Sequence, residues 1–290
     1  MEKLLHWSIA NAQGDSEAVA RAGQPDPKLL EQLFGGGPDE PTLMKHAMAV
    51  ISNPEATLEN KLTAFDNFEM LIENLDNANN IENLKLWEPL IAVLDSPESE
   101  LRAFALSVTG TAVQNNEKSQ NNFAKYDGSL AKVMQIAGNA QEDAQVRIKG
   151  FYTLSSLIRH NKEIYKQFYE LDGLKLIAPV LNDANANEKL KLRVMALLST
   201  IMTVADVKDA KFLSLLRDDN IISSTLSFLQ PESNLYLIDR VLNFLAQLID
   251  IGFEFSASEL EQLKAGVHNI KPVEDRLNED DYKTVQYVFK

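Results

Sequence analysis

The chain of 290 residues is 45% hydrophobic, enough for a substantial buried core, and carries 28 basic against 42 acidic side chains, for a net charge of −14. This negative charge repels phosphate backbones and anionic lipid surfaces, so nucleic acid and membranes are disfavoured as partners. The absence of cysteine excludes disulfides and cysteine-ligated zinc, and suits a reducing compartment such as the cytoplasm. No stretch predicts a signal peptide or a membrane span.

The first 41 residues differ in composition from the rest, because they hold five of the twelve glycines and four of the ten prolines. We therefore expect a flexible leader over residues 1–41 and a helical domain over residues 42–290. Two short amphipathic helices are predicted in the leader, and DPKLLEQLF forms the second, with Asp26 as its N-cap. Its apolar side chains are Leu29, Leu30, Leu33 and Phe34. Helices this short are only marginally stable without packing partners, so we expect them either to dock on the helical domain or to bind another protein.

A repeat organises the domain. Similar segments begin at Leu101, Val146, Leu192 and Leu237, in steps of 45, 46 and 45 residues, and a fainter copy begins near Asn60. The repeats are expected near residues 58–95, 101–137, 146–181, 192–229 and 237–252, with helical caps at both ends. Each unit predicts a helix, a turn, a second helix, a polar loop and a long third helix. Such a unit is typical of armadillo and HEAT repeats, so the predicted fold is an all-α solenoid.

Three details of the repeat make local predictions. The register places a small residue in every long third helix, which lets neighbouring helices approach closely: Ala64, Ala105, Gly150, Ala196 and Val241. The pairs Asp127-Gly128, Asp172-Gly173 and Asp219-Asn220 are expected to be turns that start a helix. Ser258 followed by Glu261 predicts a capping box in the C-terminal cap.

No pattern of catalytic chemistry is present in the sequence. The four histidines are scattered, with no pair at helical ligand spacing, and no phosphate-binding glycine loop or nucleophile elbow occurs. We therefore expect a binding protein with no catalytic residue, metal or cofactor. The ladder of Trp and Asn by which importin-type armadillo proteins grip basic peptides is also missing, because Trp7 and Trp87 are the only tryptophans.

A narrower resemblance covers almost the whole chain. The segments LLHWSIANAQGD, GQPDPKLLEQLFGGGPDEPTLMKHAM, KLTAFDNFEMLIENLDNANNIENLKLWEPLI and DRLNEDDY resemble the Fes-type armadillo nucleotide exchange factors. The resemblance implies a cytosolic cochaperone of the heat shock protein 70 chaperones. It further implies that the concave face grips one lobe of the chaperone's ATPase domain and displaces the other, which loosens ADP. The leader would separately help to clear bound polypeptide, with its Leu and Phe side chains imitating a client.

The candidate contact residues come from two places. One register position, three residues before the small residue of each third helix, is basic in four repeats: Lys61, Arg102, Arg147 and Arg193. These side chains either line the rim of the concave face, with Arg193 and Arg147 as leading candidates, or brace neighbouring repeats. Asn77, Ala78 and Asn79 are expected in a polar loop, which is either a plain Asn-rich turn or a site of close approach by a partner backbone.

Two functions remain open from the sequence. The chain is either an exchange factor that promotes ADP and client release, or an armadillo scaffold that bridges two proteins without exchange. Release of labelled ADP from the chaperone separates them, because a scaffold leaves that rate unchanged. No coiled-coil heptad is present, so a monomer is expected.

Overall fold

The computed structural model describes residues 38–289. These residues belong to two units that meet in sequence between His46 and Ala47, and of the first unit only residues 38–46 are described. The predicted leader helices lie outside the described residues, as do the side chains Leu29, Leu30, Leu33 and Phe34. The first described helix, α4 (Glu40–Ser52), crosses the boundary between the units and corresponds to the expected N-terminal cap.

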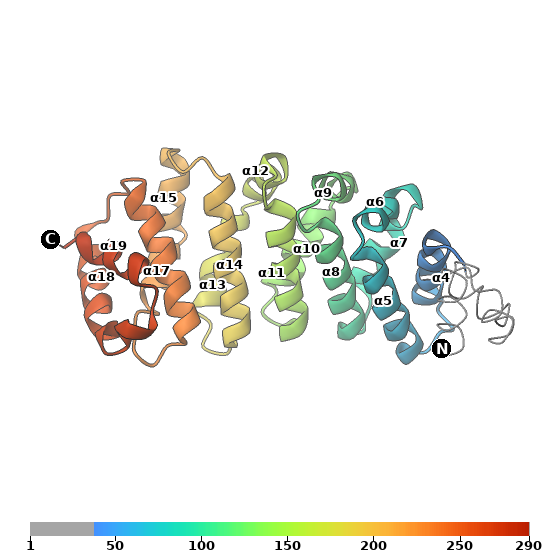
Figure 1. The fold of residues 1–290 in the computed structure, drawn as a ribbon, viewed down its shortest axis with the longest axis horizontal. Coiled ribbons are helices and arrows are strands. Elements are labelled where there is room, and N and C mark those ends of the chain that lie inside the picture. Colours follow the sequence, from blue (N-terminus) through green and yellow to red (C-terminus); the bar gives the residue numbers. More distant parts are fainter. Residues whose placement is uncertain (1–37, 290) are drawn as a thin grey trace, which may run out of the picture. The chain divides into compact units, whose positions relative to one another are not determined.

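The unit from residue 47 onward is built on five long helices, one from each predicted repeat. They are α5 (Leu58–Ile72), α8 (Ser99–Val113), α11 (Ala144–Ile158), α14 (Glu188–Val204) and α17 (Leu235–Asp250). Each packs on the next, so they form a single row, called here the ladder (Figure 1). The side of the row that faces the viewer in Figure 1 is called the ladder face.

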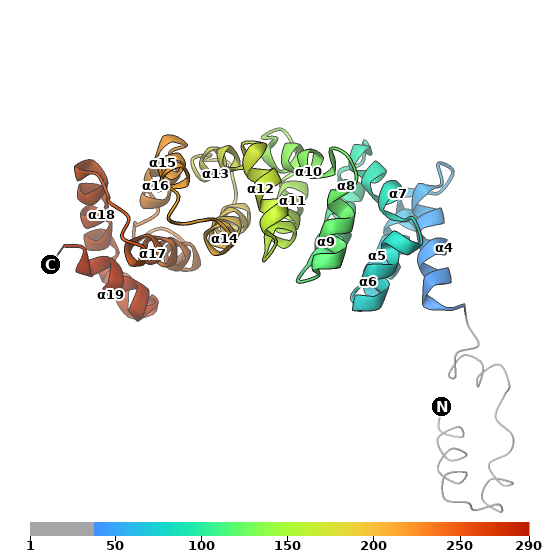
Figure 2. The same ribbon diagram turned by 90° about the horizontal axis from the view of Figure 1, so that it is seen from above.

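Shorter helices complete the repeats and the C-terminal cap. They are α6 (Leu75–Asn83), α7 (Trp87–Ala92), η1 (Val93–Asp95), α9 (Glu117–Ala124), α10 (Ser129–Gly138), α12 (Lys162–Glu170), η2 (Gly173–Leu176), α13 (Ile177–Leu181), α15 (Ala210–Asp218), α16 (Ile221–Leu226), α18 (Ala257–Ile270), η3 (Lys271–Arg276) and α19 (Glu279–Tyr287). Figure 2 shows α10, α13 and α16 as a second layer on one side of the ladder. No strand occurs in residues 38–289, and the prediction of an all-α solenoid is confirmed.

Large apolar side chains from successive repeats form the core. Phe65, Phe68, Phe123 and Phe151 are fully buried, and each such ring stabilises the fold by about 1.5–3 kcal/mol through apolar area removed from water. The ring of Trp87 on α7 is fully buried too, and lies edge-on to Phe123 on α9 with ring centres 5.5 Å apart. Trp87 therefore joins the first two repeats in the core.

The small register residue at Gly150 permits a close contact between α11 and α10. A Cβ atom at Gly150 would lie 2.9 Å from the Cβ of Ala137 and 3.2 Å from its Cα. Both distances are shorter than carbon atoms normally tolerate, so a larger residue would push the two helices apart. The expectation that a small residue serves close packing is confirmed at this position.

The predicted turns have the left-handed backbone that such turns require. Gly128, Asp172 and Asn220 have φ values of 70°, 59° and 58°, and each immediately precedes the second helix of its repeat. Gly, Asn and Asp tolerate this conformation better than other residues, which is why these residue types recur here.

Two local predictions were wrong. The stretch from Asn77 to Asn79, predicted to be a polar loop, lies inside helix α6. Asn74 caps this helix by accepting the N–H groups of Asp76 and Asn77. The packing of buried Ile81 overrides the weak helix propensity of asparagine.

The capping box of α18 lies two residues earlier than predicted. Ser256 accepts the Glu259 N–H at 3.3 Å, and the Glu259 carboxylate accepts the Ser256 N–H at 2.7 Å. The alternative pair Ser258 and Glu261 has the same spacing, so the sequence pattern alone did not distinguish the two.

Candidate functional site

The four basic residues of the predicted register position lie in different environments. Arg193 on α14 is exposed, Arg147 on α11 is buried, and Lys61 on α5 and Arg102 on α8 are half-buried. The fifth repeat has fully buried Ile238 at this position. One register position therefore does not provide one exposed row of positive charge.

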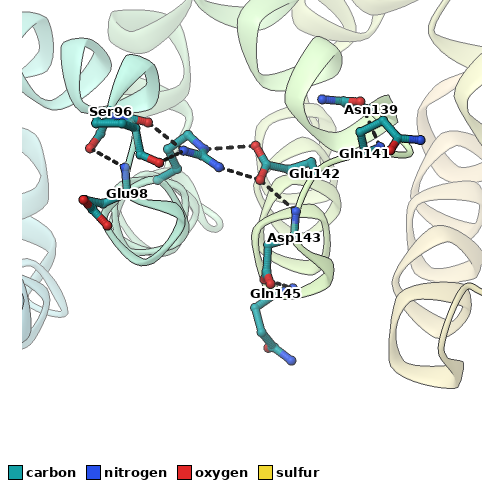
Figure 3. A network of polar contacts seen from close by, with 9 residues as sticks. Ser96, Glu98, Asn139, Gln141, Glu142, Asp143 and Gln145 are labelled. Carbon is teal, nitrogen blue, oxygen red and sulfur yellow. Dashed lines mark hydrogen bonds and ion pairs between the residues drawn. The ribbon is translucent and has the colours of Figure 1, made fainter.

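Arg102 joins its repeat to the next one. Its guanidinium donates to both carboxylate oxygens of Glu142, at 2.9 and 2.6 Å, and to the backbone carbonyls of Ser96 and Pro97. Figure 3 shows Glu142 facing the loop of Ser96. The carboxylate of Glu142 also accepts the backbone N–H of Asp143. A guanidinium with four acceptors and little exposed surface serves as a brace between neighbouring repeats.

Arg147 is held inside the protein. Its Nε donates to the backbone carbonyl of Ala137 at 3.2 Å, at the place where α11 meets α10. Burial lowers the pKa of this guanidinium, and the nearby charge of Asp183 acts against the shift. At 5% exposure, Arg147 has little surface to offer to another protein.

Arg193 on the ladder helix α14 lies above an aromatic ring. Its guanidinium is 5.3 Å from the ring centre of Tyr152 on α11, within the range of a cation–π interaction. The Tyr152 hydroxyl donates to Gln114, the C-cap residue of α8, at 3.2 Å. The ring lies so close to α8 that a Cβ at Gly110 would come within 2.5 Å of it. Three ladder helices therefore position this one arginine.

A groove of about 580 Å³ surrounds Arg193 on the ladder. Its lining comes from α11, α14 and α17 and consists of Ile148, Lys189, Leu192, Arg193, Ala196, Tyr236, Asp239 and Arg240. Lys189, Tyr236 and Arg240 were not predicted from the sequence. The prediction compared only the basic register position of each repeat, and in the fifth repeat that position is occupied by Ile238. The available signal was that Tyr236 and Arg240 lie one helical turn apart on the same helix.

A second row of polar side chains crosses the ladder from α5 to α11. Glu69 accepts the hydroxyls of Ser107 at 2.6 Å and Thr111 at 3.2 Å, and Lys149 donates to Ser107 at 2.9 Å. These residues were also not identified from the sequence. Their spacing follows the repeat, but hydrogen bonds between third helices are set by the packing of the repeats, which no local pattern specifies.

The candidates on α6 contact the following repeat. Asn77 is buried and donates to the Leu71 carbonyl at 2.9 Å. The Ala78 carbonyl and the Asn79 side-chain oxygen both accept from Ser119 on α9, at 3.2 and 3.4 Å. The structure thus brings α6 and α9 together here, in a different part of the unit from the groove around Arg193.

Between residues 38 and 289, no group of three His, Asp or Glu side chains has an arrangement suited to a metal ion. In the same range, no helix combines the length and the apolar character needed to cross a bilayer.

The fold places the chain in a known architectural class. A designed armadillo repeat protein superposes with a TM-score of 0.63 at 14% identity, covering 86% of this chain and 97% of the designed one. The crystal structure of SYS-1 superposes with a TM-score of 0.62 at 12% identity, covering 85% of this chain and 47% of SYS-1. At these identities the likeness concerns the fold alone, which is an armadillo-type solenoid.

Sequence comparison defines the family more narrowly. The family model "Nucleotide exchange factor Fes1" matches residues 1–81, and the "SIL1/FES1/HPBP1 C-terminal domain" matches residues 77–215. "Hsp70 nucleotide exchange factor FES1" of Kluyveromyces lactis is 80% identical over the full length of both chains. The protein of the same name from Saccharomyces cerevisiae is 60% identical over 99% of this chain and all of its own length. The chain belongs to the Fes1 family of nucleotide exchange factors, as its resemblance predicted.

Proposed function

We propose that this protein is a cytoplasmic cochaperone that acts as a nucleotide exchange factor for an Hsp70 chaperone. The observation that carries the proposal is full-length identity of 80% and 60% to two proteins named Hsp70 nucleotide exchange factors. Identity at this level extends over the whole ladder, which supports the same activity in this chain. The protein works as a monomer and binds no nucleotide itself.

The ladder face is proposed to be the predicted concave face and to contact the ATPase domain. Arg193 on the ladder helix α14 is exposed, and the groove around it is lined by three ladder helices, whereas Arg102 and Arg147 are engaged within the solenoid. By gripping one lobe of the ATPase domain and displacing the other, this face would open the nucleotide cleft and release ADP. The energy for opening comes from tighter binding to the open form than to the closed one.

The leader has a separate proposed role. Its apolar residues Leu29, Leu30, Leu33 and Phe34 would compete with client polypeptide once the domain has docked on the chaperone. Attachment to a docked domain raises the effective concentration of such a segment to roughly the millimolar range, so even a weak apolar motif can act.

The decisive experiment measures the release of fluorescently labelled ADP from Hsp70 in a stopped-flow instrument. An exchange factor accelerates release in proportion to its bound fraction. An unchanged rate, together with demonstrated binding, would leave the alternative of an armadillo scaffold that bridges two proteins.

A further inference from the structure

We infer that the groove between α11, α14 and α17 receives an acidic side chain of the Hsp70 ATPase domain, and that an apolar neighbour of that side chain packs on Tyr236. This inference rests on the proposed function and adds the chemistry of the partner segment. It also extends the contact from Arg193 on α14 to α17, the last helix of the ladder.

The charge of the groove is opposite to that of the whole molecule. Three basic side chains, Lys189, Arg193 and Arg240, line it on a chain whose net charge is −14. Within residues 38–289, no ion pair joins Lys189, Arg193 or Arg240 to a carboxylate of this chain. A concentration of uncompensated positive charge on an acidic protein attracts carboxylates and repels other cations.

The one carboxylate in the groove is already engaged elsewhere. Asp239 accepts the backbone N–H of Asn278, at the start of α19, at 2.8 Å. Asn278 is the N-cap of α19, so the Asp239 charge also lies next to the positive end of that helix. Asp239 therefore supports the packing of α19 on α17, and three basic groups remain for a partner.

The arginine in the centre of the groove is held in place before binding. Its cation–π contact with Tyr152, together with the Tyr152 hydrogen bond to Gln114, restricts the guanidinium to one region of the ladder. A side chain that is already ordered loses less conformational entropy when it binds. The floor next to it is apolar, because Ile148, Leu192 and Ala196 contribute to the lining.

Tyr236 provides a large apolar wall for the groove. Tyr236 is 74% exposed, whereas the other aromatic residue of α17, Phe244, is fully buried. Tyrosine and arginine, together with tryptophan, are enriched among the residues that contribute most to the affinity of protein interfaces. Tyr236 and Arg240 lie one turn apart on α17, so one short acidic segment can contact both.

The test compares variants in binding to the nucleotide-free ATPase domain of Hsp70. Arg240→Glu should lower the association rate about tenfold at low ionic strength, and the difference should shrink as salt is added, because it is electrostatic. Tyr236→Ala should weaken affinity about tenfold, mainly through faster dissociation, whereas Tyr236→Phe should retain most of the affinity. Lys264→Glu is the matched control, since it reverses an exposed charge on α18, outside the groove.

The outcomes separate the inference from the proposed function. If wild type fails to bind the ATPase domain, the proposed function is wrong. If wild type binds and both Arg240→Glu and Tyr236→Ala behave like Lys264→Glu, the inference about the groove is wrong.

Circular-dichroism melting verifies that each variant is folded. If Arg240→Glu melts early, the double variant Arg240→Ala with Lys189→Ala replaces it. Loss of affinity in this neutral pair supports the inference, and unchanged affinity overturns it.

Discussion

At the scale of single residues, equivalent positions of different repeats have different roles. Arg102, Arg147 and Arg193 occupy the same register position, yet the first pairs with Glu142, the second reaches a buried carbonyl and the third lies on an exposed ring. The difference arises from what the neighbouring segments of the solenoid place opposite each arginine: Glu142 follows Arg102 in the chain, whereas Ala137 and Tyr152 belong to the repeats before Arg147 and Arg193. Arg102 and Arg147 contact other parts of the chain and so contribute to the stability of the fold. Arg193 is exposed and can contact another protein.

The first prediction is that Arg193→Ala weakens binding to the Hsp70 ATPase domain by about 2–4 kcal/mol, thirtyfold or more, because a desolvated charged contact is lost. The melting temperature should change little, since the side chain is exposed. Isothermal titration and circular dichroism on the same sample measure both quantities. Early melting with intact affinity would instead make Arg193 a brace between repeats.

The second prediction is that Arg102→Ala lowers the free energy of unfolding by about 2 kcal/mol, because the Glu142 carboxylate, with a side chain only 10% exposed, loses its partner. Urea unfolding measures the loss. Lys132→Ala breaks a more exposed pair with Asp95 and should cost less than about 0.5 kcal/mol. Adding Glu142→Gln to Arg102→Ala should restore part of the stability, and equal losses in the two single variants would contradict the assignment of Arg102 as a brace.

At the scale of elements, the sequence was informative wherever local chemistry and period decide the structure. The five ladder helices follow from the repeat, and the turns at Gly128, Asp172 and Asn220 follow from residues that tolerate positive φ. Helix α6 was missed, because its asparagines favour turns and only packing of the repeat makes them helical. The groove was missed for a related reason. Its lining comes from three helices, and their relative placement depends on packing rather than on any short motif.

The third prediction concerns acid stability at the N-terminus of α18. Burial alone would raise the pKa of Glu259, but hydrogen bonds from Arg217 and Ser256 outweigh it and hold the pKa below its usual value. A carboxyl group with a lowered pKa stabilises the folded state above its usual pKa, and this contribution is lost as pH falls through the folded value.

Wild type should therefore lose melting temperature below about pH 4.3, the usual value for glutamate, and Glu259→Gln should lose less over the same range. Melting curves between pH 7 and pH 3 test this expectation. Glu261→Gln, at an exposed position on the same helix, is the matched control and should follow wild type. An acid profile of Glu259→Gln identical to that of wild type would contradict the role of this carboxylate.

At the scale of the whole molecule, polar contacts between neighbouring segments recur along the solenoid. Glu69 with Ser107, Arg102 with Glu142, and Arg217 with Glu259 each join residues about one repeat apart. In a solenoid such nearest-neighbour contacts determine stability, so they also keep the exposed groups of the ladder face at fixed spacing. A face whose contact groups are held at fixed distances can bind one arrangement of a partner's two lobes more tightly than another arrangement.

The fourth prediction is that removal of residues 1–41 leaves acceleration of ADP release intact and impairs release of client polypeptide. The reason is that exchange is assigned to the ladder and client competition to Leu29, Leu30, Leu33 and Phe34. Labelled ADP and a labelled client peptide measure the two activities in parallel. The quadruple change of these four residues to serine in the full chain should reproduce the defect. Complete loss of exchange on truncation would overturn this division of roles.

The fifth prediction follows from thermodynamic linkage. A protein that weakens nucleotide binding to Hsp70 must itself be bound more weakly, by the same factor, when nucleotide is present. Affinity for the ATPase domain should thus be highest without nucleotide and fall on addition of ADP. A hundredfold fall corresponds to about 2.7 kcal/mol of coupling between the two sites. Titrations with and without ADP give this factor directly, and the ratio of ADP affinities with and without the protein must equal it. Arg193→Ala should reduce affinity in both titrations while retaining part of the coupling, because the remaining ladder contacts still favour the open form. If affinity is the same with and without ADP, the ladder face does not distinguish the two forms of its partner, and binding without exchange describes the protein better.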